Sequence, residues 1–142
     1  MASSNLGILR CPLEERPRAL EILYQGLERR VRAALVAEAL EDSRAGRVDL
    51  SGLWIARKPG WTTAEKLVGA ILTQSLAGRA AAVWPPQATA SPWNRAEVAE
   101  ALVRGALAGL RDSGVAIAQA VLDVDADPRG AVDLARGGMP RV

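Results

Sequence analysis

The chain has 142 residues, of which 49% are hydrophobic, so we expect a single globular domain over residues 1–142 with a flexible tail at residues 1–4. Its 18 basic and 16 acidic side chains leave a net charge of only +2, and the basic residues are mixed with glutamates, so no nucleic-acid partner is expected. There is no histidine and a single cysteine, Cys11, which excludes internal disulfides, the common zinc ligand sets and histidine-dependent catalysis.

The hydrophobic runs of the sequence are too short to span a membrane, so no membrane partner is expected. None reaches the ~20 residues that cross a bilayer, and the N-terminus has no charged segment followed by an apolar core. A cytoplasmic location is therefore expected.

Cys11 is expected to be a small buried residue at the end of the first strand.

The first third of the chain predicts one strand and two helices. Leu6–Cys11 is short and apolar enough for a strand, and Pro17 suits the first turn of a helix that runs to about Gly26. Apolar residues then recur at helical spacing from Leu27, with Glu38 among the residues turned outward. This second helix should stop near Gly46.

Three strands of an antiparallel meander are predicted next, over Leu50–Arg57, Lys66–Ser75 and Ala80–Trp84. The turns between them are expected at Pro59-Gly60 and at Ala77-Gly78. The third strand ends at a double proline, Pro85-Pro86, which cannot donate to a sheet ladder. Such an interrupted strand edge is a place where some folds receive an extended ligand.

The last third predicts helix, strand and helix. Asn94 and Glu97 form a capping box at the start of a helix that closes at Ser113-Gly114, and Gly105 and Gly109 within it indicate close approach of one face to a sheet.

The segment after this helix is a nearly continuous apolar run, Val115–Val124, which predicts a strand buried on both faces. A short helix follows Asp127-Pro128 and runs to about Arg136. Met139–Val142 is interpreted as the beginning of one more strand.

This order of elements resembles the GNAT superfamily of N-acetyltransferases. The likeness is carried by Val83-Trp84-Pro85 at the strand end, by the helix that opens at Asn94 and leads into Val115–Asp123, and by the closing Gly138-Met139. It implies an α+β fold in α/β/α layers, with a mixed, mostly antiparallel central sheet flanked by helices and with its last strands incomplete.

The resemblance also implies acetyl-CoA as the cofactor and an amine, not identified by the sequence, as the acetyl acceptor. The pantetheine arm would pair with Ala82, Val83 and Trp84. The pyrophosphate would lie near the N-terminus of the helix at Asn94, where free N–H groups and the helix dipole favour an anion. The residues expected beside it are Gln87, Ala88, Thr89, Ala90 and Ser91.

The sequence departs from the family pattern at several functional positions. Ala90 and Pro92 replace both glycines of the phosphate-binding motif, which weakens a tight backbone cradle and makes weak acetyl-CoA binding the expectation. Leu134 stands where family members that use a tyrosine acid carry it, and the only tyrosine, Tyr24, falls on the first helix. Ala80–Trp84 offers no carboxylate to act as a base.

Catalytic residues therefore stay unassigned, and turnover near background is expected. Two functions remain open: an N-acetyltransferase-like domain, or an inactive GNAT-fold module for binding or interaction that accompanies an active copy in a longer tandem protein.

Two other groups of residues, the aspartates around the end of the predicted strand and the tryptophans, are weaker evidence for a function. Asp123, Asp125 and Asp127 mimic a calcium loop, but the glycine and glutamate that the loop requires are missing, so no metal site is predicted. Of the four tryptophans, Trp54 and Trp84 are predicted to be core anchors, and Trp61 and Trp93 to be contact residues.

One edge of the predicted sheet is incompletely paired. Because little chain follows the last helix, Ala116–Val124 should keep unpaired backbone groups beside apolar side chains. Self-association through this edge is expected, so the protein partner is a homodimer mate or a second GNAT domain.

Overall fold

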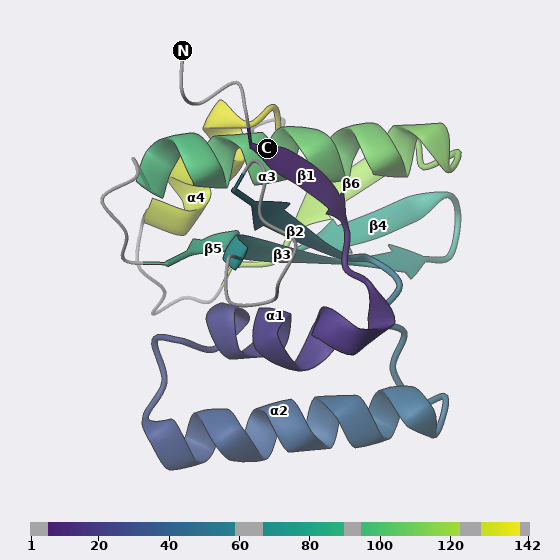
Figure 1. The fold of residues 1–142 in the computed structure, drawn as a ribbon. Coiled ribbons are helices and arrows are strands. Elements are labelled where there is room, and N and C mark those ends of the chain that lie inside the picture. The colour runs from purple at the N-terminus through teal and green to yellow at the C-terminus, as the bar shows by residue number, and fades with distance from the viewer. Residues whose placement is uncertain (1–5, 59–66, 90–94, 123–128, 140–142) are drawn as a thin grey trace.

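The computed structural model describes residues 6–58, 67–89, 95–122 and 129–139. The elements in chain order are β1 (Gly7–Arg10), η2 (Leu13–Glu15), α1 (Arg16–Leu23), α2 (Arg29–Arg44), β2 (Leu53–Arg57), β3 (Leu67–Leu76), β4 (Ala80–Val83), β5 (Gln87–Ala88), α3 (Arg95–Asp112), β6 (Ile117–Ala120) and α4 (Arg129–Arg136). Figure 1 shows a central sheet with α1 and α2 on one face and α3 and α4 on the other. This arrangement confirms the predicted α+β layers.

The sheet of the described residues has the order β1-β2-β3-β4-β6, and β5 also pairs with β3. The pairs from β1 to β4 are antiparallel, which confirms the meander, whereas β4 and β6 are parallel. The predicted turn at Ala77-Gly78 is present, with φ of 78° at Gly78 and 60° at Arg79. The turn predicted at Pro59-Gly60 lies outside the described residues.

β4 and β5 are two parts of one bulged strand that runs along β3. Val83 pairs with Thr73, and pairing resumes at Gln87 opposite Ala70. Three residues, 84–86, therefore face two residues of β3, which is the count of a β-bulge. The double proline at 85–86 removes two N–H donors in the bulge, so the regular ladder ends there, as predicted.

Each face of the sheet carries its own apolar core. The face toward α1 buries Leu20, Leu53 and Ile55, and the face toward α3 buries Leu102 and Val103. α2 lies outside α1 rather than against the sheet, so only Val36 of α2 is buried (Figure 1). The sequence pattern predicted an apolar stripe on α2, but Leu27 and Val31 of that stripe are 41% and 47% exposed.

The two glycines of α3 bring this helix close to the sheet, as predicted. A Cβ at Gly105 would lie 2.4 Å from Cγ2 of Ile8, and a Cβ at Gly109 would lie 2.2 Å from Cζ2 of Trp54. Both distances are below any real contact, so only glycine fits at this spacing. Trp54 is partly buried against the same core, with the guanidinium of Arg10 5.4 Å from its ring centroid.

The prediction of a doubly buried strand over Val115–Val124 is wrong. The strand is shorter, Ile117–Ala120, and its ladder within the described residues is with β4 alone. Ile117 is 56% exposed and Leu122 is 47% exposed. A continuous apolar run shows that a segment favours a strand, but not that other elements cover both of its faces.

Among the described residues, no helix is both long and apolar enough to cross a membrane. Met139 is buried and follows α4 without strand pairing in the described chain. The rest of the predicted last strand lies outside the described residues, as do Asn94, Trp61, Trp93 and the three aspartates of the rejected calcium loop.

Candidate functional site

The parallel strands β4 and β6 separate at the bulge. Their pairing ends at Val83 and Ala120, after which the N–H of Val121 still donates to the carbonyl of Val83 at 2.9 Å. Beyond this bond the bulged strand follows β3 through β5, while Val121 and Leu122 form no further ladder pair. The two strands therefore diverge and leave a gap between them, which we call the strand gap.

One side of the strand gap is closed by α4. A Cβ at Gly130 would lie 2.9 Å from Cβ of Pro85, so the first turn of α4 packs directly on the bulge. The opposite side leads into a cavity of about 750 Å³ between the sheet and the helices α1 and α2. This volume is in the range of small-molecule sites.

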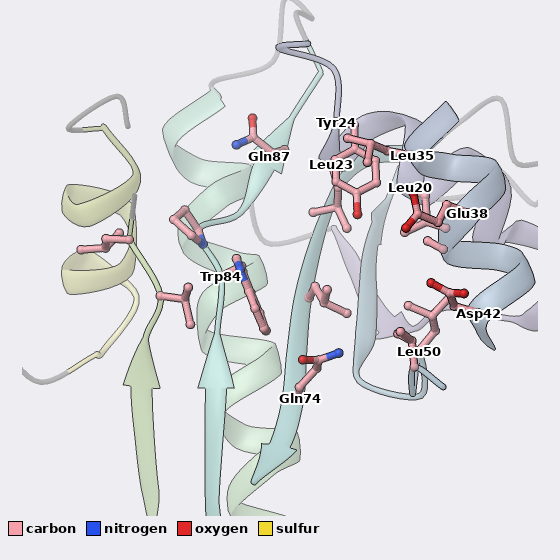
Figure 2. A pocket seen from close by; sticks show the side chains of 16 residues that line it. Leu20, Leu23, Tyr24, Leu35, Glu38, Asp42, Leu50, Gln74, Trp84 and Gln87 are labelled. Carbon is pink, nitrogen blue, oxygen red and sulfur yellow. The ribbon is translucent and has the colours of Figure 1, made fainter. Parts of the chain in front are cut away.

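The cavity, called here the acceptor pocket, draws its lining from four parts of the fold (Figure 2). Its residues are Leu20, Leu23 and Tyr24 from α1 and its end; Leu35, Glu38, Ala39 and Asp42 from α2; Val48, Leu50, Leu72 and Gln74 from the segment before β2 and from β3; and Trp84, Pro85, Gln87, Val121 and Leu122 from the strand gap.

Tyr24 is placed at the centre of this site by the end of α1. Figure 2 shows its hydroxyl pointing into the acceptor pocket, on the side where Glu38 of α2 lies. Burial, and secondly the negative charge of Glu38, raise the pKa of the Tyr24 phenol above its ordinary value of 10.0. The phenol is therefore neutral at physiological pH and is able to donate a proton.

The two carboxylates of the acceptor pocket, Glu38 and Asp42, lie one turn apart on α2. Oδ1 of Asp42 accepts a hydrogen bond from Nε of Arg47 at 3.0 Å and forms an ion pair with Nη2 of the same side chain at 2.9 Å. The exposed side chain of Glu38 forms no hydrogen bond or ion pair with the described residues. No group of three Cys, Asp or Glu side chains in the described ranges could hold a metal ion.

The connection between α1 and α2 is anchored to the bulged strand by Gln25. Its Nε2 donates to the carbonyl of Ala88 at 2.7 Å and to Oε1 of Gln87 at 3.4 Å. These bonds fix the end of α1, and with it Tyr24, relative to the strand gap.

The residues predicted to hold the cofactor fall into three groups. Ala82 and Val83 are paired on both sides, with β3 and with β6, so an extended ligand cannot pair with their backbone unless β6 is displaced. Trp84 and Gln87 line the acceptor pocket beside the strand gap.

In the third group, Ala88 and Thr89 form backbone hydrogen bonds within the protein, and the other three residues are not described. The carbonyl of Ala88 accepts from Gln25, and the N–H of Thr89 donates to the carbonyl of Val68 at 3.0 Å. The amide of Thr89 is thus not free for a phosphate. Ala90, Ser91 and Asn94 lie outside the described residues.

The sequence did not reveal the residues that give the acceptor pocket its chemistry. Tyr24 was set aside because it falls on the first helix, and Glu38 was interpreted as solvent-facing. Helical periodicity separates inward from outward positions, but it does not show which outward positions border a cavity. Trp84 was predicted to be a core anchor; it is only partly buried and lines the pocket instead.

The position where the resemblance places a tyrosine acid is inaccessible. Leu134 on α4 is 2% exposed and belongs to the core on the α3 side of the sheet. The only tyrosine, Tyr24, lines the acceptor pocket from the end of α1, and α1 lies on the other side of the sheet from α4 (Figure 1).

No protein-family model matches the chain, and no curated protein matches its sequence. Solved structures do match in fold. A transcriptional regulator from Bacillus halodurans C-125 superposes with a TM-score of 0.65 at 13% identity, over 95% of this chain and 93% of that chain.

Two acetyltransferases match over similar lengths. A GNAT family acetyltransferase from Brucella melitensis in complex with acetyl-CoA gives a TM-score of 0.58 at 16% identity, over 87% of this chain and 80% of that chain. An aminoglycoside acetyltransferase from an uncultured soil metagenomic sample, in complex with sisomicin, gives 0.58 at 14% identity, over 99% and 91%. The chain therefore has the GNAT acetyltransferase fold.

Proposed function

We propose that this chain binds acetyl-CoA in the strand gap and transfers the acetyl group to an amine held in the acceptor pocket. The observation that carries the proposal is that the strand gap opens into the pocket, because Trp84 and Pro85 from one strand and Val121 and Leu122 from the other line both. An acyl arm that enters between the strands therefore ends beside the acceptor. A cytoplasmic location belongs to the same proposal.

The bulge makes this binding weak. An extended arm beside a strand gains affinity from main-chain hydrogen bonds, but Pro85 and Pro86 have no N–H to donate. The arm must therefore rely on the apolar surface of Trp84 and Leu122. The phosphates are proposed to lie near Gln87 and the N-terminus of α3, as the resemblance implies.

Tyr24 supplies the proton chemistry in this proposal. The neutral amine attacks the carbonyl carbon of the thioester, a C–N bond forms and the C–S bond breaks. The leaving thiolate takes the proton of the Tyr24 phenol, and the phenolate is reprotonated by the proton that the new amide nitrogen loses. A positioned acid of this kind contributes about 10²- to 10⁴-fold to a rate.

The second candidate function is an acyl-CoA or protein-binding module without turnover. It is favoured by the double proline, which removes donors from the strand gap, and by buried Leu134, which leaves α4 without an acid at the expected position. An acyl-CoA-binding module differs from the transferase only in catalysis, whereas a protein-binding module differs also in its ligand.

Isothermal titration with acetyl-CoA tests the binding step. Val121→Trp places bulk at the strand gap, and Ile117→Trp is the matched control, since it adds the same ring to the exposed start of the same strand. We expect Val121→Trp to weaken binding about tenfold or more and Ile117→Trp to leave it unchanged. No binding by the wild-type chain at about 10 mM ligand, or equal binding by both variants, would overturn the proposal.

Thiol release with a panel of amines decides between the two functions. For a transferase, Tyr24→Phe should lower kcat about tenfold or more and leave the Kd of acetyl-CoA unchanged. Background turnover by a wild-type chain that binds acetyl-CoA assigns the module function instead. Robust turnover that survives Tyr24→Phe would show that the chemistry lies elsewhere.

A further inference from the structure

The acceptor pocket is chemically asymmetric. Sixteen described residues line it, and only two of them are charged: Glu38 and Asp42, both acidic and both on α2. The strand gap on the opposite side contributes Trp84, Pro85 and Val121, none of which is charged. A ligand that spans the pocket therefore meets apolar or neutral groups at one end and negative charge at the other.

The negative charge at the α2 end is only partly compensated. Arg47 occupies one oxygen of Asp42, and Glu38 has no ion-pair partner among the described residues. The negative charge of Glu38 acts on groups that line the pocket, because it contributes to the raised pKa of Tyr24. A cation bound between the two carboxylates would offset this charge.

Between the two ends, most of the wall is apolar. Leucines supply much of it, namely Leu20, Leu23, Leu35, Leu50 and Leu72, beside the polar side chains of Tyr24 and Gln74. Figure 2 shows Leu20, Leu35 and Leu50 on the same side of the pocket as the two carboxylates, with Trp84 facing them from the sheet.

We propose that the acceptor is a small primary amine joined to an apolar body, with its ammonium held by Glu38 and Asp42 and its body packed on the leucines and Trp84. This proposal rests on the proposed function, since it names the substrate class of the same site. The ammonium must give one proton to solvent water, and the neutral amine must then move from the carboxylates toward the thioester before it attacks. The carboxylates are thus specificity-determining residues and not catalytic ones.

Binding of simple amines to the free chain, without acetyl-CoA, tests this inference by NMR titration. The probe is phenethylamine. 2-Phenylethanol lacks its charge and ethanolamine lacks its apolar body. We expect phenethylamine to bind about three- to fivefold more tightly than 2-phenylethanol, and ethanolamine not to bind detectably. Leucinamide adds a polar amide beside the amine, as in a peptide N-terminus; tighter binding of leucinamide than of phenethylamine would contradict an acceptor with an apolar body.

Two substitutions on α2 test whether the preference for a charged amine depends on the carboxylate of Glu38. Glu38→Gln should remove the preference for phenethylamine over 2-phenylethanol. Glu41→Gln should keep it, because Glu41 lies on the same helix but does not line the pocket and pairs with Arg44. Circular dichroism confirms that both variants fold. Equal loss in both variants, or ethanolamine binding as tightly as phenethylamine, would overturn the inference.

Failure of the acceptor proposal and failure of the transferase proposal give different combinations of acetyl-CoA and phenethylamine binding. If acetyl-CoA binds in the strand gap and phenethylamine does not bind, the acceptor class is wrong and the cofactor site stands. If phenethylamine binds through Glu38 and acetyl-CoA does not, the pocket is an amine site and the transferase proposal fails.

Discussion

At the residue scale, a side chain's chemistry here depends on which cavity or core it faces, and the sequence does not show this. Tyr24 and Cys11 are each the only residue of their type in the chain. Tyr24 lines the acceptor pocket, whereas Cys11 is buried beside η2 in the core on the α1 side. The burial of Cys11 was predicted from its place at the end of an apolar strand; the position of Tyr24 follows only from how α1 ends against β5.

Because Tyr24 is the only tyrosine, the ultraviolet absorbance of phenolate reports its ionisation alone. We expect its midpoint in the folded chain to lie above the ordinary pKa of 10.0, and Glu38→Gln to move the midpoint down by removing a nearby negative charge. The neutral form is favoured by folding, so stability should fall as the pH rises from 10.0 through the folded pKa. A folded midpoint at or below 10.0 would contradict this placement of Tyr24.

Cys11 should be inert in the folded chain. Burial, and secondly the charge of Glu15, raise the pKa of its thiol to about 12, so almost no thiolate exists near neutral pH. We expect mass spectrometry to show slow alkylation by iodoacetamide in buffer and rapid alkylation in denaturant. Equal rates under the two conditions would show that the first strand does not pack as described.

At the element scale, periodicity and turn signals predicted nearly every helix and strand, but not how deeply each is covered. α2 was predicted as an amphipathic helix, and it packs on α1 alone, so part of its apolar stripe is left to solvent. The run from Val115 predicted a strand and overestimated its burial. Whether a strand is central or at an edge depends on distant segments, which local sequence does not encode.

The glycines of α3 are the element-scale feature that the sequence did predict, and they are open to a direct test. Gly109→Ala forces a methyl group into the ring of Trp54, and overpacking of this kind costs about 1–3 kcal/mol. Gly26→Ala is the control, because no atom lies within 4 Å of its Cβ position and its φ is not positive. Urea unfolding should show a loss for Gly109→Ala and no loss for Gly26→Ala; similar stabilities for the two variants would contradict the close helix–sheet contact.

At the scale of the whole molecule, the described part of the sheet has two edge strands, β1 and β6. β6 has a ladder partner on one side only within the described residues, and Ile117, Leu122 and Val132 expose apolar side chains along that edge. Next to them lies a groove of about 1120 Å³ between β6 and α4. Unpaired strand edges with apolar neighbours are templates for association.

We therefore predict that the chain self-associates by pairing β6 of one copy with β6 of another. No charged residue lies within Ile117–Ala120 to oppose such pairing. Light scattering should show a mass that increases with concentration, and Ile117→Lys should restore the monomer, since a lysine on an edge opposes pairing. A monomeric wild-type chain at all concentrations, with fast amide exchange along β6, would refute the prediction.

Acetyl-CoA binding in the strand gap is the central claim, and chemical-shift mapping of an isotope-labelled chain during an acetyl-CoA titration tests it most directly. We predict that the largest changes fall on the amides of Gln87 and Val121 and on the indole of Trp84, with smaller changes at Tyr24. The amides of Ile117 and Val132, in the groove on the other side of β6, should not move. The absence of shifts at millimolar ligand, or shifts confined to that groove, would contradict the account.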